Sequence, residues 1–395
     1  MEKKVVIYLT IITFSVIFCG SILYFLIFGV EKKITASPEN VKNLEECKVA
    51  RYVGENAINF VFFSTKEDAL GYSDFLLKEK PFNKNADKFN VFYIDDYDTS
   101  NDCEIYRGIA ILCKSKELTK KAASCPNDYV VVLQEKENSI RSSAYQGVMS
   151  LNKVHPLSVF NHEFGHVFAE FAEEYLADNT NLPRRAKNCV ADCTEFEGLN
   201  EGCYLGCTRS DYYRSIENGV MRTLSVSNYG NFNENVLEER IEEDISSSFS
   251  QITGKFVSKI TGRAVDRNLD CENQKTFIAT VKYSDEKGFE VINEEVIPGC
   301  AGGSGHGKFG YRLLDGSGNL ILEKNIHLLN LHTEGPGEIV DGLISIEGSE
   351  ISNPFYSYQI QAPVIEEIDT LQITDEEGRI SEINLRGAGG RACIV

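Results

Sequence analysis

The segment from Pro156 to Phe168 constrains the fold of this chain most strongly. Proline is favoured in the first turn of a helix, where its missing N–H costs nothing. Apolar residues then recur at helical spacing, which indicates a buried helix. These residues are Leu157, Val159, Phe160, Phe164, Val167 and Phe168. Three polar residues, His162, Glu163 and His166, lie among them. The sequence therefore predicts a helix that carries polar side chains into apolar surroundings.

The spacing of the two histidines indicates metal chemistry. Residues four apart lie on one face of a helix, so the imidazoles of His162 and His166 can hold one zinc ion. Glu163, between them, can take a proton from a metal-activated water. The alternative is a pair of surface histidines on an amphipathic helix, which the apolar neighbours argue against. The pattern predicts a Zn²⁺ site of the metallopeptidase type, with Glu163 as the catalytic base.

A third protein ligand must follow His166, and the sequence leaves two candidates. In metzincins a glycine three residues after the second histidine turns the chain back to the metal. That position is Ala169 here, and the usual third-ligand position is Ala172. The next carboxylates are Glu173 and Glu174, and either of them can complete the site.

Residues 162–175, HEFGHVFAEFAEEY, resemble the HEFGHSFxxLADEY signature of the clostridial-type IgA-specific metallopeptidase family. The resemblance covers roughly residues 50–250 and is most specific at the histidine motif. Other similar segments are residues 57–63, 80–82, 89–92, 125–128, 213–215, 220–222 and 229–234.

The resemblance implies a zincin-like, metzincin-related catalytic domain. In that family pattern His162 and His166 are zinc ligands, and the Asp-Glu pair that supplies the third ligand is represented here by Glu173 and Glu174. Met221 falls at the position of the Met-turn beneath the metal. Tyr175 falls where it can orient a ligand or bind the developing oxyanion, with packing in the turn as its alternative role.

The rest of the chain predicts two domains of different character. Strands over 57–63, 89–94, 128–133 and 144–151 alternate with helices over 66–80 and 234–250, which predicts an α+β catalytic domain over 44–253. From residue 254 to 395, short apolar runs alternate with Gly, Asn and Asp turns. That pattern predicts an accessory β-sandwich, immunoglobulin-like in type. His327 and His332 lie in this second domain and receive no role.

The first thirty residues predict a membrane anchor. No charged residue occurs from Val5 to Val30, and a helix of roughly 20 apolar residues spans a bilayer. Residues 1–30 are therefore expected to form a transmembrane signal anchor and residues 31–43 a stalk. The catalytic part would then lie outside the cytoplasm, with a cleaved, secreted form as the alternative.

Cysteine usage predicts disulfides. Eleven cysteines follow the apolar segment, which is typical of an oxidising compartment. Cys189, Cys193, Cys203 and Cys207 predict two disulfides, with a structural zinc site as the alternative. Cys271 and Cys300 can pair within the second domain, and Cys47, Cys103, Cys113 and Cys125 can form two more bridges, whose connectivity the sequence leaves open.

Net charge limits the class of partner. The chain carries a formal charge of −19, whereas nucleic-acid binders carry basic surfaces. We therefore expect a protein or peptide substrate, no nucleic acid, and contact with a membrane only through residues 5–30. The sequence favours a zinc-dependent endopeptidase that hydrolyses extracellular proteins. The alternative is a non-catalytic, membrane-anchored binding or adhesion protein on a peptidase-derived scaffold. The sequence does not indicate whether the protein is a monomer or an oligomer.

Overall fold

The structure is a computed structural model, and part of the chain is described. The described residues are 44–176, 186–199, 201–250, 270–284, 288–302, 309–326, 331–351, 357–364, 368–374 and 380–384. All of them belong to one compact unit, Ser37–Val395. The predicted stalk, the predicted domain boundary near residue 253, Cys393 and His327 lie outside the described residues.

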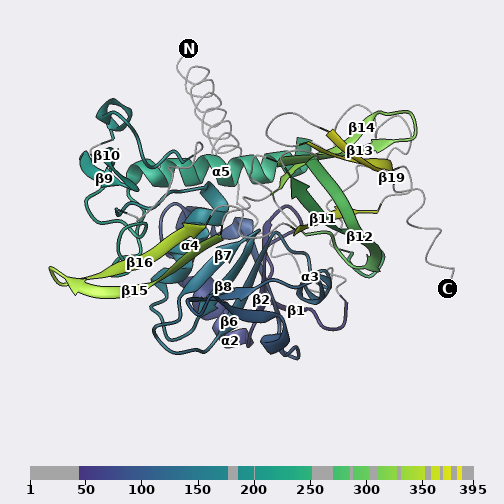
Figure 1. Ribbon diagram of the computed structural model, residues 1–395, viewed down its shortest axis with the longest axis horizontal. Helices are drawn as coiled ribbons and strands as arrows, with labels where there is room; N and C mark the ends of the chain where they lie inside the picture. The colour runs from purple at the N-terminus through teal and green to yellow at the C-terminus, as the bar shows by residue number, and fades with distance from the viewer. Residues whose placement is uncertain are drawn as a thin grey trace, which may run out of the picture. The chain divides into compact units, whose positions relative to one another are not determined.

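An eight-stranded mixed sheet forms the centre of this unit (Figure 1). In sheet order its strands are β1 (Lys48–Arg51), β3 (Phe89–Ile94), β2 (Ile58–Phe63), β6 (Tyr129–Gln134), β8 (Val148–Asn152), β7 (Ser142–Tyr145), β15 (Leu331–Val340) and β16 (Leu343–Ile351). The four strands from β3 to β8 are parallel. Strand β1 and the strands from β7 onward pair in antiparallel fashion.

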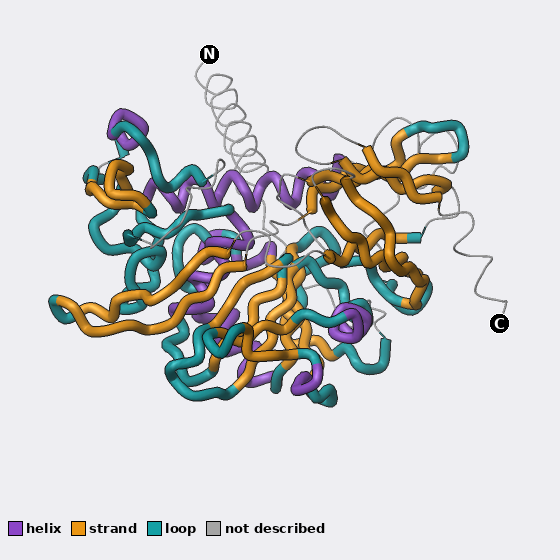
Figure 2. The backbone as a smooth tube through the Cα atoms, viewed as in Figure 1, coloured by secondary structure: helices purple, strands orange, loops and turns teal. Residues whose placement is uncertain are grey.

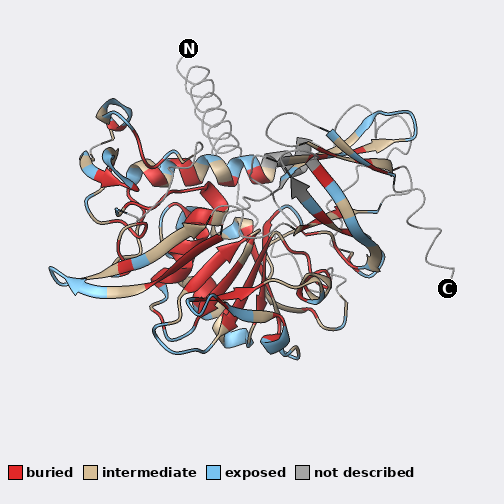
Figure 3. Cartoon of the chain, viewed as in Figure 1, coloured by how far each residue is buried: buried red, intermediate tan, exposed pale blue. Residues whose placement is uncertain are grey.

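Both faces of the sheet are covered, which explains the continuous apolar sequence of β2. Phe60 and Phe62 point to the face that carries the helix with the histidine motif, while Val61 and Phe63 point to the opposite face. The first face is covered by α2 (Lys66–Leu76), α4 (Ser158–Ala169) and α5 (Asn231–Ser250), and the second by α3 (Lys116–Ala122). The buried strands stand out in Figure 3. The core of the first face is largely aromatic and fixes α4 against the sheet.

Two further sheets pack face to face around their own core. The first contains β12 (Gly288–Pro298), β11 (Lys275–Ser284) and β17 (Ser357–Pro363); the second contains β14 (Leu320–Ile326), β13 (Phe309–Asp315), β18 (Ile368–Thr374) and β19 (Ile380–Asn384). Phe277, Val281 and Ile360 from one sheet meet Leu313 and Leu371 from the other.

Short elements and disulfides complete the unit. The small sheets are β4 (Cys103–Tyr106) with β5 (Ala110–Cys113) and β9 (Tyr204–Cys207) with β10 (Arg209–Arg214), and the 3-10 helices are Phe82–Lys84, Ala86–Lys88, Thr99–Asn101 and Cys193–Phe196. The disulfides are Cys47–Cys125, Cys103–Cys113, Cys189–Cys207, Cys193–Cys203 and Cys271–Cys300. The prediction of disulfides is confirmed, and the four clustered cysteines pair with one another instead of forming a zinc site.

The predicted fold class is wrong. The described residues are 42% strand and 21% helix, with four α-helices and several sheets, so the fold is mostly β rather than α+β (Figure 2). The predicted order, a zincin-like domain followed by an immunoglobulin-like sandwich, fails for a physical reason. The hairpin of β15 and β16 comes from the predicted sandwich but extends the central sheet beside β7.

The predicted membrane anchor is also corrected. Residues 1–30, on which that prediction falls, lie outside the described residues, and no helix within the described part is long and apolar enough to cross a membrane. The longest, α5, has 20 residues but carries acidic side chains at short intervals along its length. The structure therefore gives no support to a membrane-anchored location with an N-terminal transmembrane helix.

Candidate metal centre

Helix α4 carries the predicted motif into the core of the protein. His162, Glu163 and His166 are buried, at 0–1% exposure. Phe160, Phe164 and Phe168 on the same helix pack into the aromatic core over the sheet. Burial of ionisable groups is costly unless they are paired or bind metal, so this site calls for a charged partner.

The chain turns back toward the histidines directly after α4. Glu170 adopts a left-handed conformation, with φ of 55°, and its N–H bonds to the carbonyl of His166 at 3.1 Å. The N–H of Phe171 bonds to the carbonyl of Gly165 at 3.2 Å. Glycine is usual at such a helix end, but here a glutamate makes the turn. This turn brings Glu173 back beside the two histidines.

His162, His166 and Glu173 place three ligand atoms at the spacing of a metal site. The two Nε2 atoms are 3.0 Å apart, and the Glu173 oxygens lie 3.2 Å from Nε2 of His166 and 3.5 Å from Nε2 of His162. Ligands at 2.0–2.1 Å from a tetrahedral metal lie roughly 3.3 Å from one another. Glu334 completes a buried group whose ligand atoms all lie within 4.8 Å of one another. This group could bind a metal ion.

The hydrogen bonds of both histidines orient them for ligation. Nδ1 of His162 donates to the carbonyl of Val220 at 2.9 Å, and Nδ1 of His166 donates to the carbonyl of Phe171 at 2.6 Å. A carbonyl oxygen can only accept, so each Nδ1 carries a proton and each Nε2 is the ring nitrogen that faces the metal-binding group. Metal-binding histidines are commonly held in this way.

The charges of the group attract one positive charge to its centre. Burial lowers the pKa of His162 to about 4. Burial also opposes a charge on His166, but the carboxylate of Glu173 outweighs it and raises the pKa of His166 to about 9. The charged form of Glu173 is opposed by burial and favoured by His166 and His162, and its pKa falls well below the usual range. The carboxylate of Glu173 attracts a positive charge, which a proton on His166 or a bound metal ion can supply.

The structure separates the two candidate third ligands. Glu173 belongs to the metal-binding group, whereas Glu174 points away from it. Oε1 of Glu174 accepts hydrogen bonds from Asn233 at 2.7 Å and from Asn188 at 3.4 Å. Burial raises the pKa of Glu174 to about 7. Glu174 therefore supports the turn, and Glu173 is in place to ligate.

Met221 lies against the back of the motif. A Cβ placed on Gly165 would lie 2.6 Å from the sulfur of Met221, so the methionine packs on the helix between the two histidines. The carbonyl of Met221 also accepts the N–H of Glu174 at 2.9 Å. The segment Val220–Met221 thus holds both the histidine helix and the turn that follows it.

Glu163 lies beside the metal-binding group and interacts with Glu334, a member of that group. The two carboxyl groups are close enough to share a hydrogen bond when one of them carries a proton. Burial raises the pKa of Glu163 to about 8. Burial and the neighbouring Glu163 raise the pKa of Glu334 well above its usual range. A cation in the group would favour the charged forms of both.

Tyr175 lies on the side of the site that Glu334 closes. Its hydroxyl is buried and has no hydrogen-bond partner within the described chain. A Cβ on Gly348 would meet this hydroxyl at 2.5 Å and Cγ of Glu334 at 2.8 Å, so the three residues are in contact. The predicted alternatives for Tyr175, ligand support and packing, both match this position.

His332 and Glu334 are the residues that sequence reasoning missed. Both lie on β15, whose residues His332, Thr333 and Glu334 pair with Ala144, Ser143 and Ser142 of β7. The ring of His332 stacks on that of His166. No local spacing links these residues to the histidine motif, because strand pairing alone brings them there.

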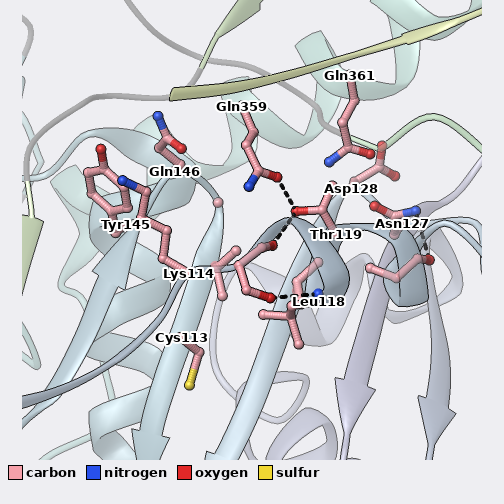
Figure 4. Close-up of a pocket in the computed structure, with 15 residues that line it drawn as sticks. Cys113, Lys114, Leu118, Thr119, Asn127, Asp128, Tyr145, Gln146, Gln359 and Gln361 are labelled. Carbon is pink, nitrogen blue, oxygen red and sulfur yellow. Dashed lines mark hydrogen bonds between the residues drawn. The ribbon is translucent and has the colours of Figure 1, made fainter. Parts of the chain in front are cut away.

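A separate pocket lies away from the motif, where α3 and β7 approach β17 (Figure 4). Its lining includes Lys114, Asn127, Tyr145, Gln359 and Gln361, and none of its lining residues belongs to the metal-binding group. Thr119 donates a hydrogen bond to Gln359 at 2.6 Å across it. This hydrogen bond joins β17 to α3. The pocket is not part of the candidate metal centre.

Neither the models of known protein families nor the curated proteins with which the chain was compared give a match.

Proposed function

We propose that this protein is a zinc-dependent endopeptidase whose metal is held by His162, His166 and Glu173. The observation that carries this proposal is the set of three ligand atoms with mutual distances of 3.0, 3.2 and 3.5 Å. Two imidazole nitrogens and one carboxylate form a common donor set of catalytic zinc, and the distances fit its tetrahedral geometry. The resemblance of residues 162–175 to the IgA-specific metallopeptidase signature supports the same donors.

Zinc bound there would lower the pKa of a water molecule and polarise the carbonyl of a peptide bond. Glu163 is the group that would take the proton. It follows the first ligand on the same helix, and its fully buried side chain interacts with His166 and Glu173 of the metal-binding group. A catalytic base works best when its pKa is close to the working pH, and burial raises the pKa of Glu163 toward that range.

A non-catalytic binding role on the same scaffold is the second candidate. One observation favours it: the metal-binding group is buried and includes a fourth possible ligand, the carboxylate of Glu334. Structural zinc sites are closed by four protein ligands, whereas catalytic sites keep one position open. The two functions therefore predict different results for a substitution of Glu163. Peptide cleavage depends on this residue if the protein is a peptidase, whereas a binding protein does not cleave peptides.

The test compares the wild-type protein with Glu163→Gln and with Glu197→Gln, a matched change at an exposed site. Each protein is assayed for bound zinc and for cleavage of a fluorogenic peptide library at high enzyme concentration. We expect about one zinc ion per chain in all three, with cleavage lost only in Glu163→Gln by a factor of about 10³ or more. Purified wild-type protein without zinc, or cleavage that survives Glu163→Gln, would contradict the proposal.

A further inference from the structure

Strand β15 covers the edge of β7 beside the candidate metal centre, and β16 then forms the outer edge of the sheet. Without β15 and β16, the outermost strand on this side would be β7. Exposed edge strands bind extended peptides by main-chain hydrogen bonds, which add one strand to the sheet. Residues 332–334 of β15 make this type of pairing with residues 142–144 of β7. An extended peptide substrate and β15 would therefore compete for one edge.

The side chain of Glu334 reaches from this strand into the metal-binding group. It is fully buried, and its ligand atom lies within 4.8 Å of those of His162, His166 and Glu173. A catalytic zinc ion has three protein ligands and keeps its fourth position for water or substrate. Glu334 is the carboxylate available to fill that position.

The site is closed to solvent, and residues of the hairpin form part of its wall. His162, Glu163, His166 and Glu173 are at most 2% exposed. A substrate carbonyl must reach the metal and Glu163 for hydrolysis, and these groups are buried while β15 is in place. The structure thus combines a complete set of catalytic groups with a blocked approach.

We propose that the hairpin Leu331–Ile351 is a built-in inhibitor, which occupies the position of an extended peptide substrate along β7 while Glu334 blocks the metal. This inference rests on the proposed peptidase function. It also assigns the substrate position, an antiparallel strand beside Ser142–Tyr145.

The hairpin is attached to the rest of the unit more weakly than its two strands are to each other. Strands β15 and β16 pair over eight residue pairs, whereas β15 pairs with β7 over three. On the other side, Ile344 exchanges backbone and side-chain hydrogen bonds with residues 223–225. Its tip extends from the central sheet (Figure 1), and Ile339 there is 73% exposed. The backbone pairing with β7 is thus shorter than the pairing within the hairpin, and on this inference the hairpin leaves the edge as one piece.

Gly348 gives a way to displace the hairpin without removing a ligand. It pairs with Glu334 across the hairpin, and an added Cβ would lie 2.5 Å from the Tyr175 hydroxyl and 2.8 Å from the carbonyl of Thr333. Of these contacts only the Tyr175 hydroxyl lies outside the hairpin, so the methyl group of Gly348→Ala should push the hairpin away from Tyr175 and also disturb its own pairing at Thr333. Gly71→Ala adds the same methyl group where nothing lies within 4 Å and serves as its control.

The experiment uses two matched pairs in the full chain: Gly348→Ala with Gly71→Ala, and Glu334→Gln with Glu338→Gln, an exposed residue on the same hairpin. Two quantities are measured, the rate at which a chelator removes zinc and the rate of cleavage of the fluorogenic peptide library. A site that is open in about 1% of molecules gains up to about 100-fold when it is opened fully. We expect Gly348→Ala and Glu334→Gln to raise both rates at least about tenfold, the controls to match wild type, and added Glu163→Gln to abolish cleavage.

The two readouts separate this inference from the proposed function. Zinc loss from Gly348→Ala at the wild-type rate would overturn the inference, and so would slower cleavage in Glu334→Gln than in wild type. Faster zinc loss without cleavage in either variant would overturn the peptidase function itself, and the inhibitory role with it.

Discussion

The imidazole of His332 stacks on the imidazole of His166, with ring centroids 4.1 Å apart and ring planes 16° apart. Its Nδ1 lies 3.9 Å from Oε1 of Glu173, whereas Nε2 of His166 lies 3.2 Å from the same oxygen. His332 thus forms a wall of the metal centre rather than one of its ligands.

His332→Phe should therefore keep the bound metal, because a phenyl ring preserves the stacking area while removing both nitrogens. His332→Ala should lower the free energy of unfolding by about 1–3 kcal/mol, since it removes a buried ring from the core. Zinc content and urea unfolding of the two variants check this. Loss of zinc from the phenylalanine variant would instead make His332 a ligand.

The neighbouring glutamates give a matched test of the ligand set. Glu173→Gln should weaken zinc binding by at least about 100-fold, because an amide oxygen carries no charge for the metal. Glu174→Gln should bind zinc as wild type does, since its amide oxygen can still accept the hydrogen bonds from Asn233 and Asn188. Competition with a chromophoric chelator measures both affinities. Equal losses in the two variants would count against Glu173 as the ligand.

The contact between Gly165 and Met221 predicts a strong effect of one added methyl group. Gly165→Ala should lower the free energy of unfolding by about 1–3 kcal/mol, because its Cβ would lie 2.6 Å from the Met221 sulfur in a filled core. Gly71→Ala, in the middle of α2 and with open space around it, should raise stability by about 0.5–1 kcal/mol. Urea unfolding with the disulfides intact measures both changes. A Gly165 variant as stable as wild type would show that Met221 does not press on the helix.

Stability should fall in mild acid because of His155. Its Nε2 donates to the carbonyl of Asn138 at 3.1 Å, so its Nδ1 accepts from the hydroxyl of Ser142 at 3.2 Å. The folded protein therefore holds the neutral ring, and burial lowers the pKa of His155. The unfolded chain has the ordinary histidine pKa of about 6.5, so the unfolded state binds more protons below that pH.

The contribution of His155 is thus fully present above about pH 6.5 and declines as the pH falls toward its folded-state pKa. The urea midpoint, measured between pH 7.5 and pH 5, checks this trend. His155→Gln keeps one donor and one acceptor but does not titrate, so its midpoint should change less with pH. Identical slopes for the two proteins would remove His155 as the cause.

Local sequence patterns predicted the parts of the site that lie close together along the chain. The helical spacing of apolar residues placed His162, Glu163 and His166 on a buried helix, and α4 has this form. The choice between Glu173 and Glu174 depended on the turn at Glu170, a left-handed glutamate that no propensity favours. Glu334 could not be found at all, because it reaches the site only through the pairing of β15 with β7.

The fold class failed for the same kind of reason. Short apolar runs predicted the strands of the C-terminal part well, but a strand pattern does not state which sheet the strand will join. The hairpin of β15 and β16 was assigned to an immunoglobulin-like domain, while its edge pairs with Ser142, Ser143 and Ala144. Tertiary packing decides which strands pair with one another, and the pattern of a single sequence does not contain this information.

The late position of β15 in the chain has a consequence during biosynthesis. Glu334 follows Glu173 by about 160 residues, which takes roughly 8–30 s to translate at 5–20 residues per second. During that interval the emerging polypeptide has the two histidines and Glu173, but neither Glu334 nor the strand that covers β7. A ribosome-bound chain would therefore carry an open candidate metal centre beside an unpaired sheet edge, and the hairpin would be the last part of the central sheet to be added.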